Sequence, residues 1–162
     1  MRTSSLLALG VSVLAWTTSA AGLTKSAGSA PYCPPRPATP KEQKVILGEF
    51  MQAFYEERNA TKALLNHVAE DYIQHNPSAL SGRTNSLGVL QPFISPKTVN
   101  YTIMHKSFQD DIAFIHYRMD LVGGGQPFAV VDVFRFNGTC VMEHWDVAQQ
   151  RTANATNPLA LF

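Results

Sequence analysis

The stretch Phe128–Val147, FAVVDVFRFNGTCVMEHWDV, decides the fold because it predicts two β-strands joined by a two-residue turn. β-Branched and aromatic side chains dominate residues 128–136, and Asn137-Gly138 supplies the two positive-φ positions that a type I′ turn needs. The second strand, residues 139–147, follows at once. Strand propensity does not explain the acid and imidazole groups of this hairpin, which are Asp132, Glu143, His144 and Asp146.

The turn also predicts which side chains share a face of the hairpin. If Phe136 pairs with Thr139, Asp132 lies directly opposite Glu143 on a mainly apolar face. Two opposed carboxylates repel, so one of them would hold a proton if that face is buried. The residues expected on this face are Val130, Asp132, Phe134, Glu143 and Trp145.

A bulge of one residue in the second strand would exchange the two faces of the hairpin. It would bring His144 and Asp146 to the side of Asp132 and turn Glu143 and Trp145 away. The residue pattern allows both registers.

Residues 1–21 have the pattern of a secretory signal peptide, with one Arg, an apolar run over residues 6–16 and then small residues. The apolar run is shorter than the ~20 residues that cross a bilayer, so we expect cleavage rather than a membrane anchor. The mature protein is therefore expected to be secreted and free of the membrane.

The rest of the chain predicts one domain. Residues 22–40 are rich in Pro, Ser and Ala and hold too few apolar side chains to fold alone, so they are expected to form a flexible leader. Residues 41–150 are enough for a single domain with one core, and residues 151–162 form a C-terminal tail.

Charge and spacing argue against several classes of partner. The chain has 13 Lys and Arg against 12 Asp and Glu and no basic cluster, which argues against nucleic acid. The 5 histidines lack the spacing of a metal-binding motif, and no Gly-rich phosphate loop occurs. We therefore expect neither a metal nor a cofactor.

Both cysteines, Cys33 and Cys140, follow the signal peptide. In an oxidising compartment they can pair and tie the leader to the hairpin, and the alternative is a reactive thiol. Four sequons predict sites for N-glycosylation, at Asn59, Asn100, Asn137 and Asn154.

Apolar residues at helical spacing predict helices over residues 40–58 and 61–69 and a short one over 88–93. Strand patterns cover residues 99–108 and 112–122, ahead of the hairpin. Helices followed by a four-strand meander predict an α+β fold, with the N-terminal helices packed on a curved antiparallel sheet.

Together, these features resemble the SnoaL-like branch of the nuclear-transport-factor-two-like superfamily. The resemblance rests on the two helices, on a Y-x-x-H-N-P segment from Tyr72 to Pro77 followed by Gly82, and on the hairpin VVDVFRFNG…EHWDV. It covers nearly all of the chain after Lys41 and implies a cone with an internal apolar pocket, often in a homodimer. That superfamily contains ketosteroid isomerase, scytalone dehydratase and polyketide cyclases, and also binding proteins without known chemistry.

The resemblance also implies catalytic residues. Asp132 matches the protonated aspartic acid that donates a hydrogen bond to the substrate oxyanion in ketosteroid isomerase. That enzyme has an aspartate base just before a proline, where this chain has His75 and Asn76, so a steroid isomerase is not implied. His75 is the candidate general base. The alternatives are that His75 stabilises the turn at Pro77 and that Asp132 pairs with Arg118.

Other side chains are expected to form the pocket wall, although packing in the core would explain some of them equally well. The predicted substrate-binding residues are Tyr72, Phe134, Glu143 and Trp145, and His144 and Asp146 are the alternative catalytic residues if the last strand is bulged.

These expectations favour a secreted enzyme without a cofactor that isomerises, cyclises or dehydrates a small carbonyl-containing molecule by general acid-base proton transfer. One alternative is a secreted protein that binds a small apolar molecule in the same pocket without turnover. Another is a dimerisation module.

Overall fold

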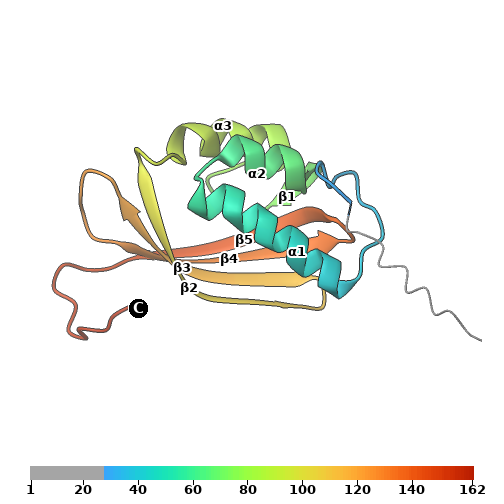
Figure 1. Ribbon diagram of the computed structural model, residues 1–162. Helices are drawn as coiled ribbons and strands as arrows, with labels where there is room; N and C mark the ends of the chain where they lie inside the picture. Colours follow the sequence, from blue (N-terminus) through green and yellow to red (C-terminus); the bar gives the residue numbers. More distant parts are fainter. Residues whose placement is uncertain (1–27) are drawn as a thin grey trace, which may run out of the picture.

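The computed structural model describes residues 28–162 (Figure 1). The expected signal peptide, residues 1–21, lies outside the described residues. The helices are α1 (Pro40–Met51), its π-helical continuation η1 (Gln52–Glu56), α2 (Ala60–His67) and α3 (Arg83–Phe93). The strands are β1 (Val68–Gln74), β2 (Val99–Gln109), β3 (Ile112–Leu121), β4 (Phe128–Asn137) and β5 (Cys140–Gln150). Within residues 28–162, no helix is long and apolar enough to cross a membrane.

Helix α1 begins with a capping box, which explains why the helix starts directly after a Pro-rich segment. The Thr39 hydroxyl accepts from the backbone N–H of Glu42 at 3.3 Å, and the Glu42 carboxylate accepts from the backbone N–H of Thr39 at 2.7 Å. Pro40 suits the first helical turn, where no backbone N–H is needed. The buried face of the helix carries Gln43, Ile46, Leu47, Phe50 and Met51.

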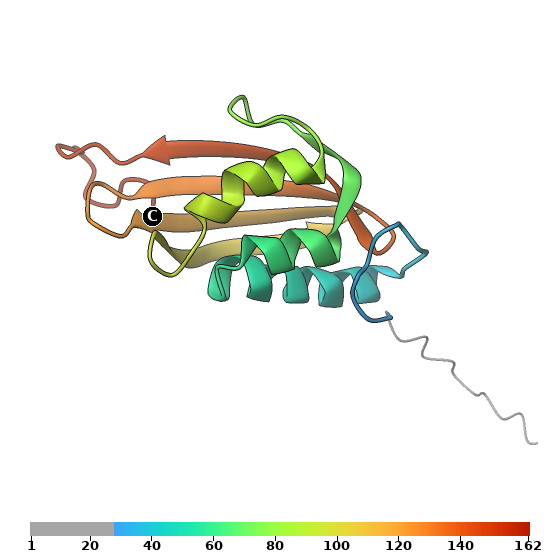
Figure 2. The same ribbon diagram turned by 90° about the horizontal axis from the view of Figure 1, so that it is seen from above.

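The five strands form one open sheet in the order β1-β5-β4-β3-β2. Strands β2 to β5 form the predicted antiparallel meander, and the helices cover one face of the sheet (Figure 2). The α+β fold is therefore confirmed. The sheet is mixed rather than wholly antiparallel, because β1 pairs with β5 in parallel. Strand β1 was not predicted, since its sequence VAEDYIQ places two acids side by side and lacks a clean alternation.

An extra residue in β5, Met142, decides which side chains of the hairpin face the helices. The ladder shifts by one position after Phe136, so that Asp132 pairs with Asp146 and not with Glu143. The face expected for an unbulged hairpin is therefore wrong, and the bulged register is correct. A single inserted residue has this effect because side chains alternate along a strand.

The hairpin turn lies one residue later than predicted. Asn137 pairs with Cys140, which leaves Gly138 and Thr139 as the two loop residues. Gly138 has a positive φ of 52°, and the carbonyl of Arg36 lies so close that a Cβ at this position would clash with it. The backbone N–H of Thr139 donates to that carbonyl at 2.9 Å, so the turn binds the N-terminal segment.

The described part of the Pro/Ser/Ala-rich segment, residues 28–39, packs against the domain. Tyr32 is 1% exposed, and its hydroxyl donates to the Glu49 carboxylate at 2.7 Å. A disulfide joins Cys33 to Cys140, with the two Cα atoms 5.1 Å apart. The segment is thus attached to both α1 and the final hairpin.

Candidate functional site

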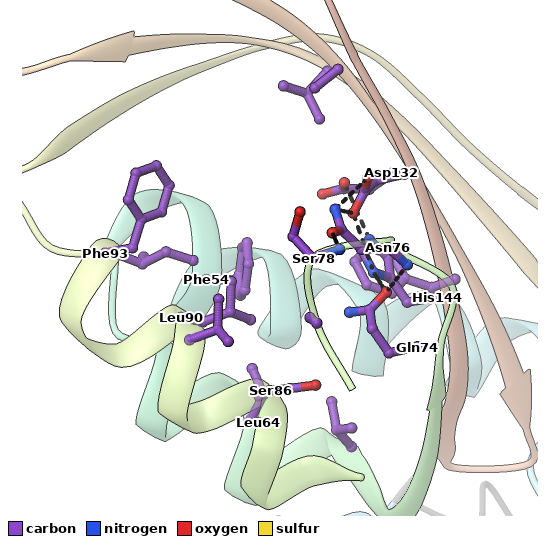
Figure 3. A pocket seen from close by; sticks show the side chains of 18 of the residues that line it. Phe54, Leu64, Gln74, Asn76, Ser78, Ser86, Leu90, Phe93, Asp132 and His144 are labelled. Atoms are coloured by element: carbon purple, nitrogen blue, oxygen red, sulfur yellow. Dashed lines mark hydrogen bonds and ion pairs between the residues drawn. The ribbon is translucent and has the colours of Figure 1, made fainter. Parts of the chain in front are cut away.

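A cavity of about 290 Å³ lies between the helices and the inner face of the sheet. One end is polar, and Figure 3 shows its side chains gathered around Asp132 and His144. The remaining wall is mainly apolar. Its residues belong to α1, η1, α2 and α3 on one side and to the strands of the sheet on the other. Representative apolar wall residues are Phe54, Leu64, Leu90, Phe93, Val130 and Phe134.

Asp132 is 3% exposed, and both of its oxygens have partners. The Tyr55 hydroxyl donates a short hydrogen bond to Oδ2, and Oδ1 lies 3.2 Å from Nε2 of His144. Strand β4 provides the carboxylate, β5 the imidazole and η1 the phenol. The pairing with Arg118 considered from sequence is not present, because Arg118 binds Asp120 at 2.8 Å.

Gln74 determines which ring nitrogen of His144 carries a proton. Its Oε1 accepts from the backbone N–H of Asn76 at 2.9 Å, and its Nε2 donates to the Tyr72 hydroxyl at 3.3 Å, which fixes the orientation of the amide. The same Oε1 lies 3.0 Å from Nδ1 of His144, so Nδ1 must be the donor. Nε2 and Asp132 then share the one remaining proton.

Asp146 lies beside this pair on β5. The Asn76 side-chain amide donates to both of its oxygens, at 2.8 and 2.7 Å, and its Oδ2 is 3.9 Å from Nδ1 of His144. The polar end of the cavity therefore combines two carboxylates and one imidazole from β4 and β5 with two amides. The amides are those of Gln74 on β1 and of Asn76 just after it.

Four tyrosines, three of them buried and one half-buried, surround the carboxylate of Asp132. Burial is the main cause that raises the pKa of each phenol above its ordinary value of 10.0, and the nearby charge of Asp132 raises it further. These phenols therefore keep their protons near neutral pH and can donate hydrogen bonds. They are Tyr55, Tyr72, Tyr101 and Tyr117, of which the last three line the cavity.

Asp132, His144 and Asp146 also offer three metal-ligand atoms that all lie within 4.8 Å of one another. Sequence spacing could not reveal this group, because the bulge in β5 brings it together. The donor set of two carboxylates and one imidazole suits a divalent cation. A cation would have to compete with the hydrogen bonds that Tyr55 and Asn76 already make to these carboxylates.

The model of the SnoaL-like domain family matches residues 47–144, which include β1 to β4, the first half of β5, and Asp132 and His144 of the polar end of the cavity. The chain belongs to the SnoaL-like family. No curated protein matches it by sequence.

Solved structures agree with this assignment at the level of the fold. An NTF2-like protein of unknown function from Mesorhizobium loti superposes with a TM-score of 0.58 at 17% identity, covering 70% of this chain and 97% of the other. An NTF2-like protein of unknown function from Burkholderia xenovorans LB400 gives 0.58 at 14% identity, covering 70% and 91%. TsrD from Streptomyces laurentii gives 0.53 at 15% identity, covering 65% and 90%.

The structure places His75, the predicted general base, outside the cavity of this SnoaL-like domain. Its Nε2 lies 2.7 Å from Oε1 of Glu143, and its ring stacks on Trp145 with centroids 4.6 Å apart. Arg135 donates to the other Glu143 oxygen at 2.6 Å, and these two partners lower the pKa of Glu143. The predicted pocket positions of His75, Glu143 and Trp145 are wrong. The bulge turns Glu143 and Trp145 outward, and His75, just after β1, points away from the cavity, opposite to its neighbour Asn76.

The other predicted site residues lie in the cavity. Tyr72 and Phe134 line it, and Phe134 stacks on the His144 ring with centroids 4.6 Å apart. His144 and Asp146, the alternatives for a bulged strand, replace the outward-facing residues. Sequence reasoning missed several polar or aromatic wall residues, which are Gln74, Asn76, Ser86, Tyr101 and Tyr117. Recognition of β1 would have revealed the first of these.

All four sequon asparagines are exposed, so their glycosylation stays a prediction. Two of them also have structural contacts. Asn59 caps α2 by accepting from the backbone N–H of Lys62 at 2.9 Å, and Asn100 accepts from Arg58 at 2.6 Å.

Proposed function

We propose that this protein is a secreted SnoaL-like enzyme that catalyses proton transfer on a small carbonyl-containing molecule without a cofactor. The observation that supports this most strongly is the Asp132–His144 pair, which shares one proton at the polar end of an apolar cavity. Such a pair can accept or return a proton with little rearrangement.

The chemistry would begin with enolisation. The Asp132 carboxylate would take the proton from the carbon next to the carbonyl group while the shared proton stays on Nε2 of His144. The electron pair of the C–H bond forms the C=C bond of the enolate, and the π electron pair of the C=O bond moves onto the carbonyl oxygen. The phenol of Tyr101, which lines the cavity and stays protonated, could donate a hydrogen bond to that oxygen, whereas the Tyr117 hydroxyl already interacts with Asp132. Return of the proton to another carbon completes an isomerisation, and the same enolate can lead to cyclisation or dehydration.

Enolisation can be tested before the natural substrate is known. NMR would follow the exchange of α-protons of 2-tetralone for deuterium in D₂O, with and without the protein. Wild-type protein should accelerate exchange, and Asp132→Asn should lower the catalysed rate about 100-fold while binding of 2-tetralone changes little. Binding without acceleration would contradict catalysis and favour a small-molecule binding protein.

Secretion and a homodimer belong to the same proposal. The Cys33–Cys140 disulfide fits an oxidising compartment.

A dimer through the outer face of the sheet would cover apolar side chains there, among them Val147, which is 72% exposed, and Phe114. Light scattering after size-exclusion chromatography should give twice the monomer mass, and Val147→Lys should shift it toward the monomer.

A further inference from the structure

We propose that the ligand of this cavity carries a positively charged nitrogen, as a protonated amine on an aromatic or alicyclic body. The inference rests on the proposed function, because it concerns the ligand of the same cavity. It follows from the charge of the polar end, from the aromatic wall and from an unpaired hydroxyl.

The charges at the polar end do not cancel. Asp132 and His144 share one proton and together are neutral. Within residues 28–162, the hydrogen-bond donor to Asp146 is the neutral side-chain amide of Asn76. The other close contact of Asp146 is the 3.9 Å approach to His144. Among the described residues that line the cavity, none is Lys or Arg. The cavity therefore has a net negative charge when Asp146 is ionised.

One basic side chain, that of Arg58, influences the cavity wall without lining the cavity. Arg58 exerts its field on Tyr101, but its guanidinium donates to Asn100 at 2.6 Å, outside the cavity lining. A carboxylate ligand would meet Asp146 without a compensating cation. An ammonium group would supply the missing positive charge and hydrogen-bond donors to Asp146.

The wall next to these acids is aromatic. Tyr101 and Tyr117 have ring centroids 5.4 Å apart, and Phe54 lies parallel to Tyr101 at 6.5 Å. All three line the cavity. Aromatic faces attract organic cations, and the attraction is larger where water is excluded.

Ser86 supplies an independent sign of a ligand. It is 1% exposed and lines the cavity from α3, and its hydroxyl has no hydrogen-bond partner among the described residues. The carbonyl four residues earlier, that of Gly82, accepts from the backbone N–H of Ser86 at 3.1 Å and, in the described structure, not from its hydroxyl. Figure 3 shows Ser86 on the helical wall, apart from the Asp132 group. A buried polar group without a partner is unfavourable in the free protein, and a polar atom of a bound ligand would pair it.

Calorimetric titration near neutral pH and at low salt would test the charge preference with three probes that share one ring system. They are 2-naphthylmethylamine as the cation, 2-naphthalenemethanol as the neutral probe and 2-naphthoate as the anion. Wild-type protein should bind the amine about tenfold more tightly than the alcohol and should bind the carboxylate most weakly.

Asp146→Asn should reduce the preference for the amine over the alcohol to about threefold or less while the affinity for the alcohol changes little. The matched control is Asp71→Asn, an exposed carboxylate on β1 outside the cavity, which should leave the order of the probes unchanged.

The inference is overturned if wild-type protein binds 2-naphthoate as tightly as the amine, or if folded Asp146→Asn keeps the full preference. The wild-type series needs no variant, so a misfolded variant does not remove the test. If the alcohol binds as tightly as the amine, this inference fails and the proposed function stands. If none of the three binds to folded wild-type protein, this inference fails, and the deuterium exchange of 2-tetralone decides the proposed function separately.

Discussion

Nε2 of His144 lies 3.2 Å from Oδ1 of Asp132, although a regular hairpin would place these residues on opposite faces. The bulge at Met142 brings them together by reversing the faces of β5 beyond it. One inserted residue thus assembles the polar end of the cavity and moves Glu143 and Trp145 to the outer face.

Gln74 should control the tautomer of His144. Gln74→Met removes the amide oxygen that accepts the Nδ1 proton, so both neutral tautomers should become populated. The ¹⁵N chemical shifts of the imidazole would report this directly, and the control Gln149→Met, at an exposed position of β5, should leave them unchanged. Identical ¹⁵N shifts in Gln74→Met and wild-type protein would show that Gln74 does not fix the tautomer.

Tyr55→Phe should destabilise the protein by about 2 kcal/mol, because it removes the hydroxyl that donates to the buried Asp132 carboxylate. Urea unfolding would measure the loss. Tyr101→Phe is the control, because it lies in the same aromatic group and its described contacts to Tyr55 are between rings. An equal loss in both variants would mean that the hydrogen bond to Asp132 has no special contribution.

His67 should make folding stability depend on pH. Burial lowers the pKa of its imidazole below the ordinary 6.5, and its Nε2 has no partner in the described structure. Below pH 6.5 the unfolded state therefore binds a proton that the folded state resists. The free energy of unfolding should fall as the pH drops through 6.5 toward the lowered pKa.

The contribution of His67 can be separated from that of other groups by comparing variants. His67→Gln should flatten the pH dependence of the urea midpoint over this range, whereas His105→Gln, at an exposed position, should not. A slope that is unchanged in His67→Gln would rule out His67 as its source.

The disulfide should contribute strongly to stability because it joins residues separated by 107 positions. Loop entropy predicts a loss of up to about 4 to 5 kcal/mol in Cys33→Ala. Guanidinium unfolding with and without a reducing agent would measure it, and reduction should affect only the wild-type protein. A loss below about 1 kcal/mol would show that the disulfide restricts the conformational entropy of the unfolded chain much less than the loop model predicts.

The sequence predicts the fold more fully than the site. The meander and the helices have clear period-2 and period-3.6 patterns, and the motifs around Tyr72 and Asp132 indicate the family. The site depends on Met142 and on β1, and neither has a distinct sequence pattern. Met142, the inserted residue, is apolar like the strand residues around it, so the sequence does not mark the bulge. The β1 sequence VAEDYIQ does not alternate cleanly between apolar and polar residues.

The same limits explain the error at His75. By resemblance to ketosteroid isomerase, the segment before Pro77 would hold the general base, and His75 is its nearest imidazole, but a role in the site depends on which side of the sheet the ring occupies. Asn76 points inward to Asp146, and His75, the preceding residue, points outward to Glu143. Successive side chains of an extended segment point to opposite sides, so these two residues are separated. The sequence alone does not say which of them points inward.

The most direct test of the account compares two histidine variants in the deuterium exchange of 2-tetralone. His144→Gln removes the imidazole that pairs with Asp132, and His75→Gln removes the one on the outer face. The account predicts that His144→Gln lowers the catalysed rate about 100-fold and that His75→Gln leaves it nearly unchanged. Loss of exchange in His75→Gln with full activity in His144→Gln would contradict it.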